Sequence, residues 1–571
     1  MPGGLLNLIS YGNQNVILNG NPSKTFFTCT YAKYTNFGMQ KFRVDYNGLR
    51  TLRMAEPSVF TFKMPKNADL LMDTHLVVNL PTIWSPIKEV KTDASGSKSE
   101  WRPYEFKWIK NLGSQMIKRV TFTIGGLKIQ EFTGQYLYNL VERDFDIAKK
   151  NTYYEMTGNV PELNDPANAF GRTNSYPNAI VFPDGSLNEE NNTNQFTQYN
   201  TLGPEPSIRN RKIYVPLNIW FTLASKMALP LVAMKYHELQ IELEIRPVQE
   251  LFVVKNITDD ISNNKYIKPD FNTDDYQLWR FLQPPPYTND GSGVLTEDEK
   301  ELSSSLYVDK RVDWDADVHL LSTYVFLTDE EARVMTNRTH KYLIKDIYEY
   351  NFYNITETKK VNLHASSGMV SSWMWYFQRT DIGKRNEWSN YTNWEYDYLP
   401  HNVKKPDGEI NSIYTDISNN SNFFYSGEFQ PENEKNIMRN WALLFDGKYR
   451  ENTQDYGVLS YIEKICHSNG SSPEGLYNYN FCINTSPFDL QPSGAINLSK
   501  FNKIEFEMTT ITPPYDDKAK VYNICNGEGD IIGVNKAIWD IFQYNYDLTV
   551  IEERYNVLTF HAGSAELMFT R

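Results

Sequence analysis

The sequence has little cysteine and no long apolar run. Its 571 residues include four cysteines, none in a CxxC pair or at zinc-site spacing from histidines: Cys29, Cys466, Cys482 and Cys525. This scarcity excludes a fold held by disulfides and is typical of a reducing compartment. The start, MPGGLLNLIS, lacks the features of a signal peptide, and no run of about 18 apolar residues could span a membrane. We therefore expect the chain to be made and assembled in the cytoplasm.

Familiar catalytic motifs are also absent. GxSxG, HExxH, Walker A and the dinucleotide fingerprint do not occur. The glycine-rich segment 527–533 lacks the Lys-Ser/Thr pair of a phosphate-binding loop, so it predicts a turn. Asp313, Asp315 and Asp317 alternate, but without the glycine and distal glutamate of a calcium-binding loop they favour a solvated strand. The sequence thus predicts no enzyme, no catalytic residue, no cofactor and no metal site.

The chain has no concentrated basic region either. It carries 57 Lys and Arg against 70 Asp and Glu, a net charge of −13. An acidic surface repels phosphate backbones. We therefore predict no direct contact with nucleic acid.

Aromatic residues and alternating strand patterns are abundant. Tyr (38) and Phe (31) suit half-buried sheet surfaces and interface cores. Residues 238–245 alternate between glutamate or glutamine and leucine or isoleucine, and residues 503–508 alternate in the same way. Gly125-Gly126 separates two alternating runs and predicts a hairpin. Period two with one polar face indicates antiparallel sheets packed on one side.

The same order of features occurs twice along the chain: short strands, one short helix, one long loop and a late alternating strand. Helical spacing predicts the first helix at 133–146, and Thr328 with Glu331 forms a capping box for the second. The fold class is therefore all-β, with two sandwiches in tandem. The expected parts are an N-terminal arm (1–23), a first unit (24–250, long loop 151–210), a linker (251–310) and a second unit (311–571, long loop about 380–480).

Four segments, in order along the chain, carry a family resemblance. They are GGLLNLISYGNQNVILNGNPSKTFF with YTNFGMQ, IYVPLNIWFTLASKMALPLVAMKYHELQIELEI, LQPSGAINLSKFNKIEFE and RYNVLTFHAGSAELMFT. Together they resemble the major capsid proteins of nucleocytoplasmic large DNA viruses, the double jelly-roll family. The segments extend from residue 3 to residue 570, while the long loops between them match nothing in that family.

This resemblance implies two eight-stranded antiparallel jelly rolls with short helices and long inserted loops. It also implies homotrimers that form pseudo-hexagonal capsomers in an icosahedral virion shell, assembled in the host cytoplasm. The implied partners are further copies of the chain, minor capsid and penton proteins, and an inner viral membrane near the N-terminal arm.

Two sets of candidate site residues follow. Asn-x-Ser/Thr sequons in long loops make four asparagines candidates for glycosylation: Asn191, Asn390, Asn419 and Asn469. Aromatic residues of the second unit are candidates for a trimer interface: Trp373, Trp375, Trp388 and Trp394. For the WMWYF segment, a core strand of the second sandwich is an equally weighted alternative.

Two other functions stay open at this point. Aromatic loops could serve a carbohydrate-binding or carbohydrate-active β-sandwich, which would need a pair of carboxylates in a cleft for catalysis. A viral scaffold protein of the same fold, shaping membranes rather than the final shell, is the second alternative.

Overall fold

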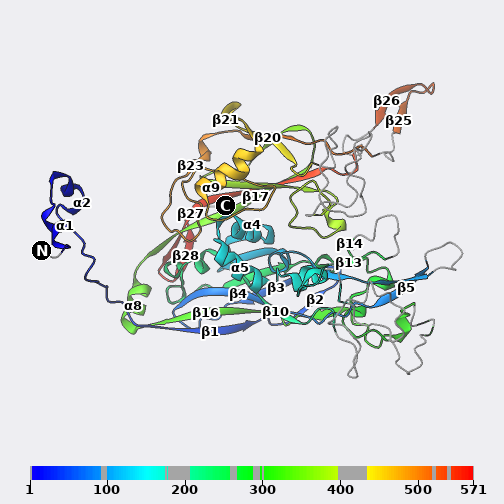
Figure 1. The fold of residues 1–571 in the computed structure, drawn as a ribbon, viewed down its shortest axis with the longest axis horizontal. Helices are drawn as coiled ribbons and strands as arrows, with labels where there is room; N and C mark the ends of the chain where they lie inside the picture. The colour runs from blue at the N-terminus through cyan, green and yellow to red at the C-terminus, as the bar shows by residue number, and fades with distance from the viewer. Residues whose placement is uncertain are drawn as a thin grey trace.

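A computed structural model provides the structure of the chain. It describes residues 3–91, 99–173, 176–177, 206–257, 266–286, 296, 298, 301–364, 366–396, 434–516, 522–535 and 542–569. These residues form two β-sandwiches, one above the other in Figure 1. Within the described residues, no helix is long and apolar enough to cross a membrane.

The first sandwich is an eight-stranded jelly roll. One sheet has the order β1 (Phe37–Asp45), β16 (His319–Leu327), β4 (Leu70–Leu80) and β10 (Arg211–Pro216), with the short β11 (Leu229–Pro230) also paired to β4. The facing sheet has the order β3 (Ser58–Lys63), β12 (Leu239–Ile245), β8 (Ile117–Ile124) and β9 (Leu127–Thr133). Numbered along the chain, the eight main strands lie in the orders 1-8-3-6 and 2-7-4-5.

The second sandwich repeats this arrangement. One sheet has the order β17 (His340–Ile355), β27 (Tyr546–His561), β19 (Met369–Arg379) and β22 (Leu476–Asn480), with β23 (Ile496–Asn497) and β28 (Ser564–Leu567) at its margins. The facing sheet has the order β18 (Thr358–Asn362), β24 (Ile504–Thr510), β20 (Met438–Phe445) and β21 (Lys448–Asp455). The orders are again 1-8-3-6 and 2-7-4-5, which confirms the expected double jelly roll.

Smaller strand pairs and helices complete the described part. The pairs are β2 (Thr51–Arg53) with β15 (Asp313–Asp315), β13 (Phe252–Lys255) with both β7 (Phe106–Trp108) and β14 (Tyr266–Ile267), β5 (Ile87–Lys91) with β6 (Ser99–Pro103), and β25 (Tyr522–Cys525) with β26 (Ile531–Asn535). The helices are α1 (Leu5–Ile9), α2 (Val16–Asn19), α3 (Leu112–Gln115), α4 (Gly134–Asp144), α5 (Ile147–Thr157), α6 (Pro161–Asn164), α8 (Asp329–Asn337) and α9 (Glu463–His467), the last preceded by a π-helical turn (Val458–Ile462).

Several local predictions are confirmed. β12 alternates strictly between buried and half-buried residues. Gly125 and Gly126 have φ of +58° and +83° between β8 and β9, the left-handed conformations that a tight hairpin needs. The predicted helices are α4 and α8. Thr328 is the N-cap residue of α8, but its side chain makes no capping hydrogen bond, so the predicted capping box with Glu331 does not form.

The expected boundary between the units at 251–310 is wrong. β16 pairs with β1 and β4, so the first jelly roll closes only at Leu327. Residues 252–255 also belong to the first unit, because β13 pairs with β7. The alternating pattern of β12 identifies a strand but not its neighbours, and β12 is the seventh strand of its jelly roll rather than the last.

Three other expected ranges need correction. The first strand begins at Phe37, and residues 24–36 are exposed without regular structure, so the arm extends beyond residue 23. The range 151–210 contains most of α5 and all of α6. The range 380–480 contains β20, β21, α9 and β22, because Trp441 and its neighbours in β20 supply core side chains.

Candidate functional site at the junction of the two jelly rolls

Helix α4 joins the two jelly rolls. It starts directly after β9, where the Thr133 hydroxyl accepts a hydrogen bond from the Tyr136 amide at 3.3 Å. All eleven of its residues are buried, although they include Glu142, Arg143 and Asp144. A helix buried on every side must be packed on every side. In Figure 1 it lies between the strands of the first jelly roll and those of the second.

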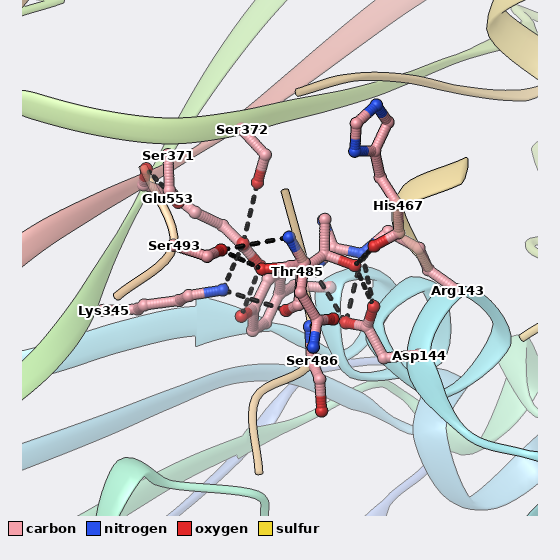
Figure 2. Close-up of polar contacts among 12 residues, drawn as sticks. Arg143, Asp144, Lys345, Ser371, Ser372, His467, Thr485, Ser486, Ser493 and Glu553 are labelled. Carbon is pink, nitrogen blue, oxygen red and sulfur yellow. Dashed lines mark hydrogen bonds and ion pairs between the residues drawn. The ribbon is translucent and has the colours of Figure 1, made fainter. Parts of the chain in front are cut away.

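An ionic network whose acids and arginine are fully buried ties α4 to the second jelly roll (Figure 2). Arg143 Nη2 lies 2.9 Å from Glu553 Oε1 on β27 and 2.8 Å from Asp144 Oδ2. The side chains of these three residues are at most 1% exposed. Lys345 Nζ on β17 lies 3.1 Å from Glu553 Oε2. Two cations from different jelly rolls therefore share one carboxylate.

Hydroxyl groups satisfy the remaining oxygens of the network. Tyr136 and Ser372 donate to the two oxygens of Glu553 at 3.1 and 2.9 Å. Thr485 donates to Asp144 Oδ1 at 2.6 Å, and its own carbonyl accepts from Lys345 at 3.0 Å. Arg143 Nη1 is buried without a partner, whereas both oxygens of Glu553 and of Asp144 have one. Buried charges are tolerated when they are paired and hydrogen-bonded in this way.

The pKa of Glu553 reflects this partnering. Burial by itself raises the pKa of the carboxyl, but the charges of Arg143 and Lys345 outweigh burial and lower it to about 2. Glu553 is thus an anion at every physiological pH, fixed between two cations. This arrangement stabilises a structure and leaves no proton to transfer near neutral pH.

Apolar and aromatic contacts extend the junction. Leu137 and Leu140 of α4 share one buried cluster with Ile551 and Phe560 of β27. The ring of Tyr391 stacks on Tyr376 with centroids 4.2 Å apart. The Tyr391 hydroxyl lies 2.7 Å from the side-chain oxygen of Gln135 and 2.8 Å from that of Asn139, both on α4.

A side chain also bridges the facing edges of the two jelly rolls. Gln130 of β9 donates to the backbone carbonyl of Lys345 at 3.0 Å, and its oxygen accepts from the Trp220 amide at 3.1 Å. The two jelly rolls are thus joined by ions, hydrogen bonds and apolar packing together.

The structure separates the four candidate interface tryptophans. Trp373 and Trp375 have no exposed surface and lie with Trp441 and Phe506 in the core of the second jelly roll, so of the two alternatives for this segment the core strand is confirmed and the interface role is wrong. Alternating positions of β19 point to opposite faces, and these two face the sandwich interior.

The other two tryptophans are half-buried. Trp388 donates from Nε1 to the carbonyl of Glu250 at 3.0 Å, and the Arg246 guanidinium lies 4.3 Å from the ring centroid. It therefore joins the two jelly rolls of one chain. Lys435 Nζ lies 4.7 Å from the ring centroid of Trp394. An interface role for Trp394 stays a prediction.

The candidate glycosylation sites also differ in exposure. Asn390 is buried, and its amide donates to the Trp394 carbonyl at 3.0 Å, so the folded chain has no room for a glycan on that nitrogen. Asn469 is exposed and stays a candidate. Asn191 and Asn419 lie outside the described residues.

The sequence analysis did not identify Arg143, Lys345 or Glu553. The available signal was weak: glutamate, arginine and aspartate follow one another inside a helix whose other residues are mostly apolar or aromatic, and two glutamates follow Ile551 in a strand. Over the described residues, no group of three or more His, Cys, Asp or Glu is placed to hold a metal ion.

Comparisons with known proteins place the chain in a family. Residues 25–280 match the model of the major capsid protein N-terminus, and residues 331–566 match that of the large eukaryotic DNA virus major capsid protein. The chain is 22% identical to the major capsid protein of Phaeocystis pouchetii virus, over 92% of the chain and 96% of that protein. It is 28% identical to that of Chrysochromulina ericina virus, over 61% of the chain but only 52% of that longer relative.

A solved structure supports the fold. The Faustovirus major capsid protein matches with a TM-score of 0.57 at 13% identity, over 94% of this chain and 93% of that one. The two family matches lie on the two jelly rolls and together include both sides of the buried junction. The chain therefore belongs to the family of large eukaryotic DNA virus major capsid proteins.

Proposed function

We propose that three copies of this chain form a pseudo-hexagonal capsomer and that such capsomers tile the icosahedral shell of a large DNA virus. The observation that carries the proposal is the repeated strand order in one chain, with the two jelly rolls fixed by the buried network of Arg143, Lys345 and Glu553. Three such blocks present six similar sandwiches around an axis, and closed cyclic symmetry is the usual form of a homo-oligomer.

The chain is a structural protein of the virion capsid. This role requires its two jelly rolls to keep a fixed orientation. A tile must hold a fixed angle between its two halves, or errors accumulate over many copies. Two observations support this role over that of a carbohydrate-active enzyme. The chain belongs to the capsid family, and the buried carboxylate of Glu553 is paired with Arg143 and Lys345.

We also propose contacts with minor capsid and penton proteins and with an inner membrane, and the N-terminal arm supports this proposal. Its apolar side chains are exposed: Leu5, Leu6, Leu8, Ile9, Val16, Ile17, Leu18, Phe26 and Phe27. Such a segment needs a partner surface to cover it. The arm leaves the molecule at the end opposite the β5 and β25–β26 strands (Figure 1), so we assign that end to the inside of the shell.

The experiment is the mass and shape of the purified protein. Light scattering should give three times the 66.5 kDa of one chain, and negative-stain microscopy should show pseudo-hexagonal particles. A monomer at micromolar concentration would overturn the trimer. Protein stoichiometry of purified virions separates a shell protein, which is abundant in them, from a scaffold protein, which is lost during maturation.

Asn469 is the described sequon best placed for a glycan, on an exposed turn after α9. Intact-mass measurement of the virion protein tests the modification, because the bare chain has a mass of 66.5 kDa.

A further inference from the structure

The two jelly rolls carry helices at equivalent places. In each, the helix connects the fifth strand to the sixth: α4 lies between β9 and β10, and the segment Val458–His467 lies between β21 and β22. α4 contacts the fourth and fifth strands, β8 and β9, whereas the π-helical turn before α9 contacts the fifth and sixth strands, β21 and β22. The two helices therefore share their place along the chain and their contact with the fifth strand.

The two helices differ in what covers them. Every residue of α4 is buried. The segment Val458–His467 instead exposes Tyr461 (63%), Ile462 (55%) and Ile465 (83%), and the neighbouring Ile483 is 73% exposed. Tyr461 and Ile465 are four residues apart and lie on one face of the segment. A cluster of large exposed apolar side chains of this kind marks a protein-binding surface.

α4 is covered by a sheet of the second jelly roll, and the segment Val458–His467 has no such covering sheet within the described part of the chain. α4 packs on the outer face of the sheet β17–β27–β19–β22, through Glu553 and Ile551 of β27. The equivalent sheet of the first jelly roll is β1–β16–β4–β10. Its inner face includes Val44, which pairs with the buried Leu320. Alternation along β1 then directs Phe37, Met39, Lys41 and Arg43 outward.

Part of that outer face is open in the single chain, at β1 and β10, whereas Val325, Thr323 and His319 at outward positions of β16 are buried. Phe37 and Met39 are 50% and 59% exposed, and Lys41 is exposed beside them. Lys212 on β10 is also exposed and lies on the same face. On the helix side, Glu463 accepts a hydrogen bond from Asn480 and Glu474 pairs with Lys435, so both carboxylates have partners within the chain. Exposed apolar groups are therefore what the two surfaces have in common.

We propose that the exposed face of Val458–His467 packs on the outer face of the β1–β16–β4–β10 sheet of a second copy. The contact would repeat between chains the packing of α4 on the second jelly roll within one chain. The two surfaces lie on opposite sides of the molecule, with α9 above and β1 and β16 below in Figure 1, so one copy cannot satisfy both itself. The contact is head-to-tail, and a 120° rotation closes it after three copies.

The proposal rests on the proposed trimer and names its interface. Ile465→Asp and Met39→Asp each place a charge on one of the two surfaces, and both residues are exposed enough in the chain to leave folding intact. Light scattering should find both variants monomeric at concentrations where the unaltered protein is trimeric. Val308→Asp, at a 96%-exposed apolar residue elsewhere, is the matched control and should stay trimeric.

The outcomes distinguish the two proposals. A monomeric unaltered protein overturns the proposed function and this inference with it. A trimeric unaltered protein with trimeric Ile465→Asp and Met39→Asp variants overturns only the interface. A deletion of residues 1–23 should leave the trimer intact, and a monomer from that deletion would assign the contact to the arm instead.

Native thiols give a second readout. Cys466 and Cys525 are both exposed in the single chain. Cys466 lies next to Ile465, whereas Cys525 lies in β25 at the far end of the molecule (Figure 1). In the trimer, alkylation of Cys466 should be slowed at least tenfold relative to the Ile465→Asp variant, with Cys525 unchanged. Equal alkylation of Cys466 in both would contradict the interface.

Discussion

In the first jelly roll, β1–β16–β4–β10 faces β3–β12–β8–β9; in the second, β17–β27–β19–β22 faces β18–β24–β20–β21. The strand order is identical, but the cores are filled differently. Trp373, Trp375, Trp441 and Phe506 meet in the second core, whereas strands β3 and β12 of the first supply Phe60, Phe62, Ile241 and Leu243. One topology therefore accepts two sets of core residues, because a fold requires filled volume more than particular side chains.

The flanks differ more than the cores do. α4 of the first jelly roll is buried under the second, while the equivalent α9 segment is exposed. The difference has a simple cause: the first jelly roll has a neighbour in the same chain on that side, and the second does not. The two jelly rolls thus differ most at the surfaces where one sandwich packs on another, and these are the surfaces that self-assembly uses.

The largest expected effect comes from removing Arg143, one of the two cations of the junction. Arg143→Met leaves Asp144 and Glu553 buried with only Lys345 to balance them. Breaking a buried pair in this way costs about 3–5 kcal/mol of unfolding free energy. Urea denaturation followed by tryptophan fluorescence, at one fixed protein concentration, measures the loss.

Arg53→Met is the matched control in the first jelly roll. Arg53 pairs with Glu56, but these side chains are 68% and 74% exposed. Water screens such pairs, and their removal costs less than about 1 kcal/mol. Equal losses for the two arginines would contradict the special role of the junction.

Acid should weaken the same junction. The folded pKa of Glu553 is about 2, below its ordinary value of 4.5, so its contribution is complete above pH 4.5 and is lost as the pH falls toward 2. The loss is roughly 3 kcal/mol over that interval. Asp381, held by Arg379 and Arg385 with a pKa of about 2, titrates in the same window.

Unfolding free energies at pH 5 and pH 2.5 measure this loss. Asp381→Asn removes the contribution of Asp381 to this loss of unfolding free energy and leaves the contribution of Glu553 in place. An Asp381→Asn variant with no remaining acid sensitivity would show that the junction does not contribute.

Predictions from the sequence succeed where a signal is local. The alternation of β12, the glycine pair after β8 and the helix that begins after Thr328 each depend on neighbouring residues, and each is confirmed. They fail where the deciding contact is distant. β16 pairs with β1 across more than 270 residues, and no local pattern in 319–327 specifies that partner.

The junction shows the same limit more sharply. Arg143 and Glu553 are 410 residues apart in the sequence. Charged residues are ordinarily expected on the solvent-exposed surface, so neither residue is predicted to be buried. Only the folded chain shows that the two charges neutralise each other out of water. Trp375 shows the converse, because an aromatic residue predicted for an interface is a core residue whose neighbours come from β20 and β24.

A smaller effect tests the aromatic part of the junction. Tyr391→Phe removes the hydroxyl that lies between Gln135 and Asn139 and leaves those buried amide groups with one partner fewer. The expected loss is about 1–2 kcal/mol in the same denaturation experiment. Tyr236→Phe, at a 72%-exposed tyrosine, should change stability by less than the error of the measurement.

A further comparison concerns two buried lysines near the helices. Lys150 is paired with Glu142 at 3.2 Å, whereas burial and the charge of Lys150 lower the pKa of Lys464 to about 7 from its ordinary 10.5. The folded chain therefore binds the Lys464 proton more weakly than the unfolded chain, and stability rises with pH between 7 and 10.5.

Lys464→Met removes this penalty, so it should raise the unfolding free energy at pH 7 by roughly 4 kcal/mol and remove most of the rise between pH 7 and 10. Lys150→Met is the control with the opposite sign, because it leaves the Glu142 carboxylate buried without its cation. Denaturation of both variants at pH 7 and pH 9.5 measures the difference. A destabilised Lys464→Met variant would mean that the lysine has a charge partner in the assembled trimer, which would place an acidic group of the neighbouring copy beside α9.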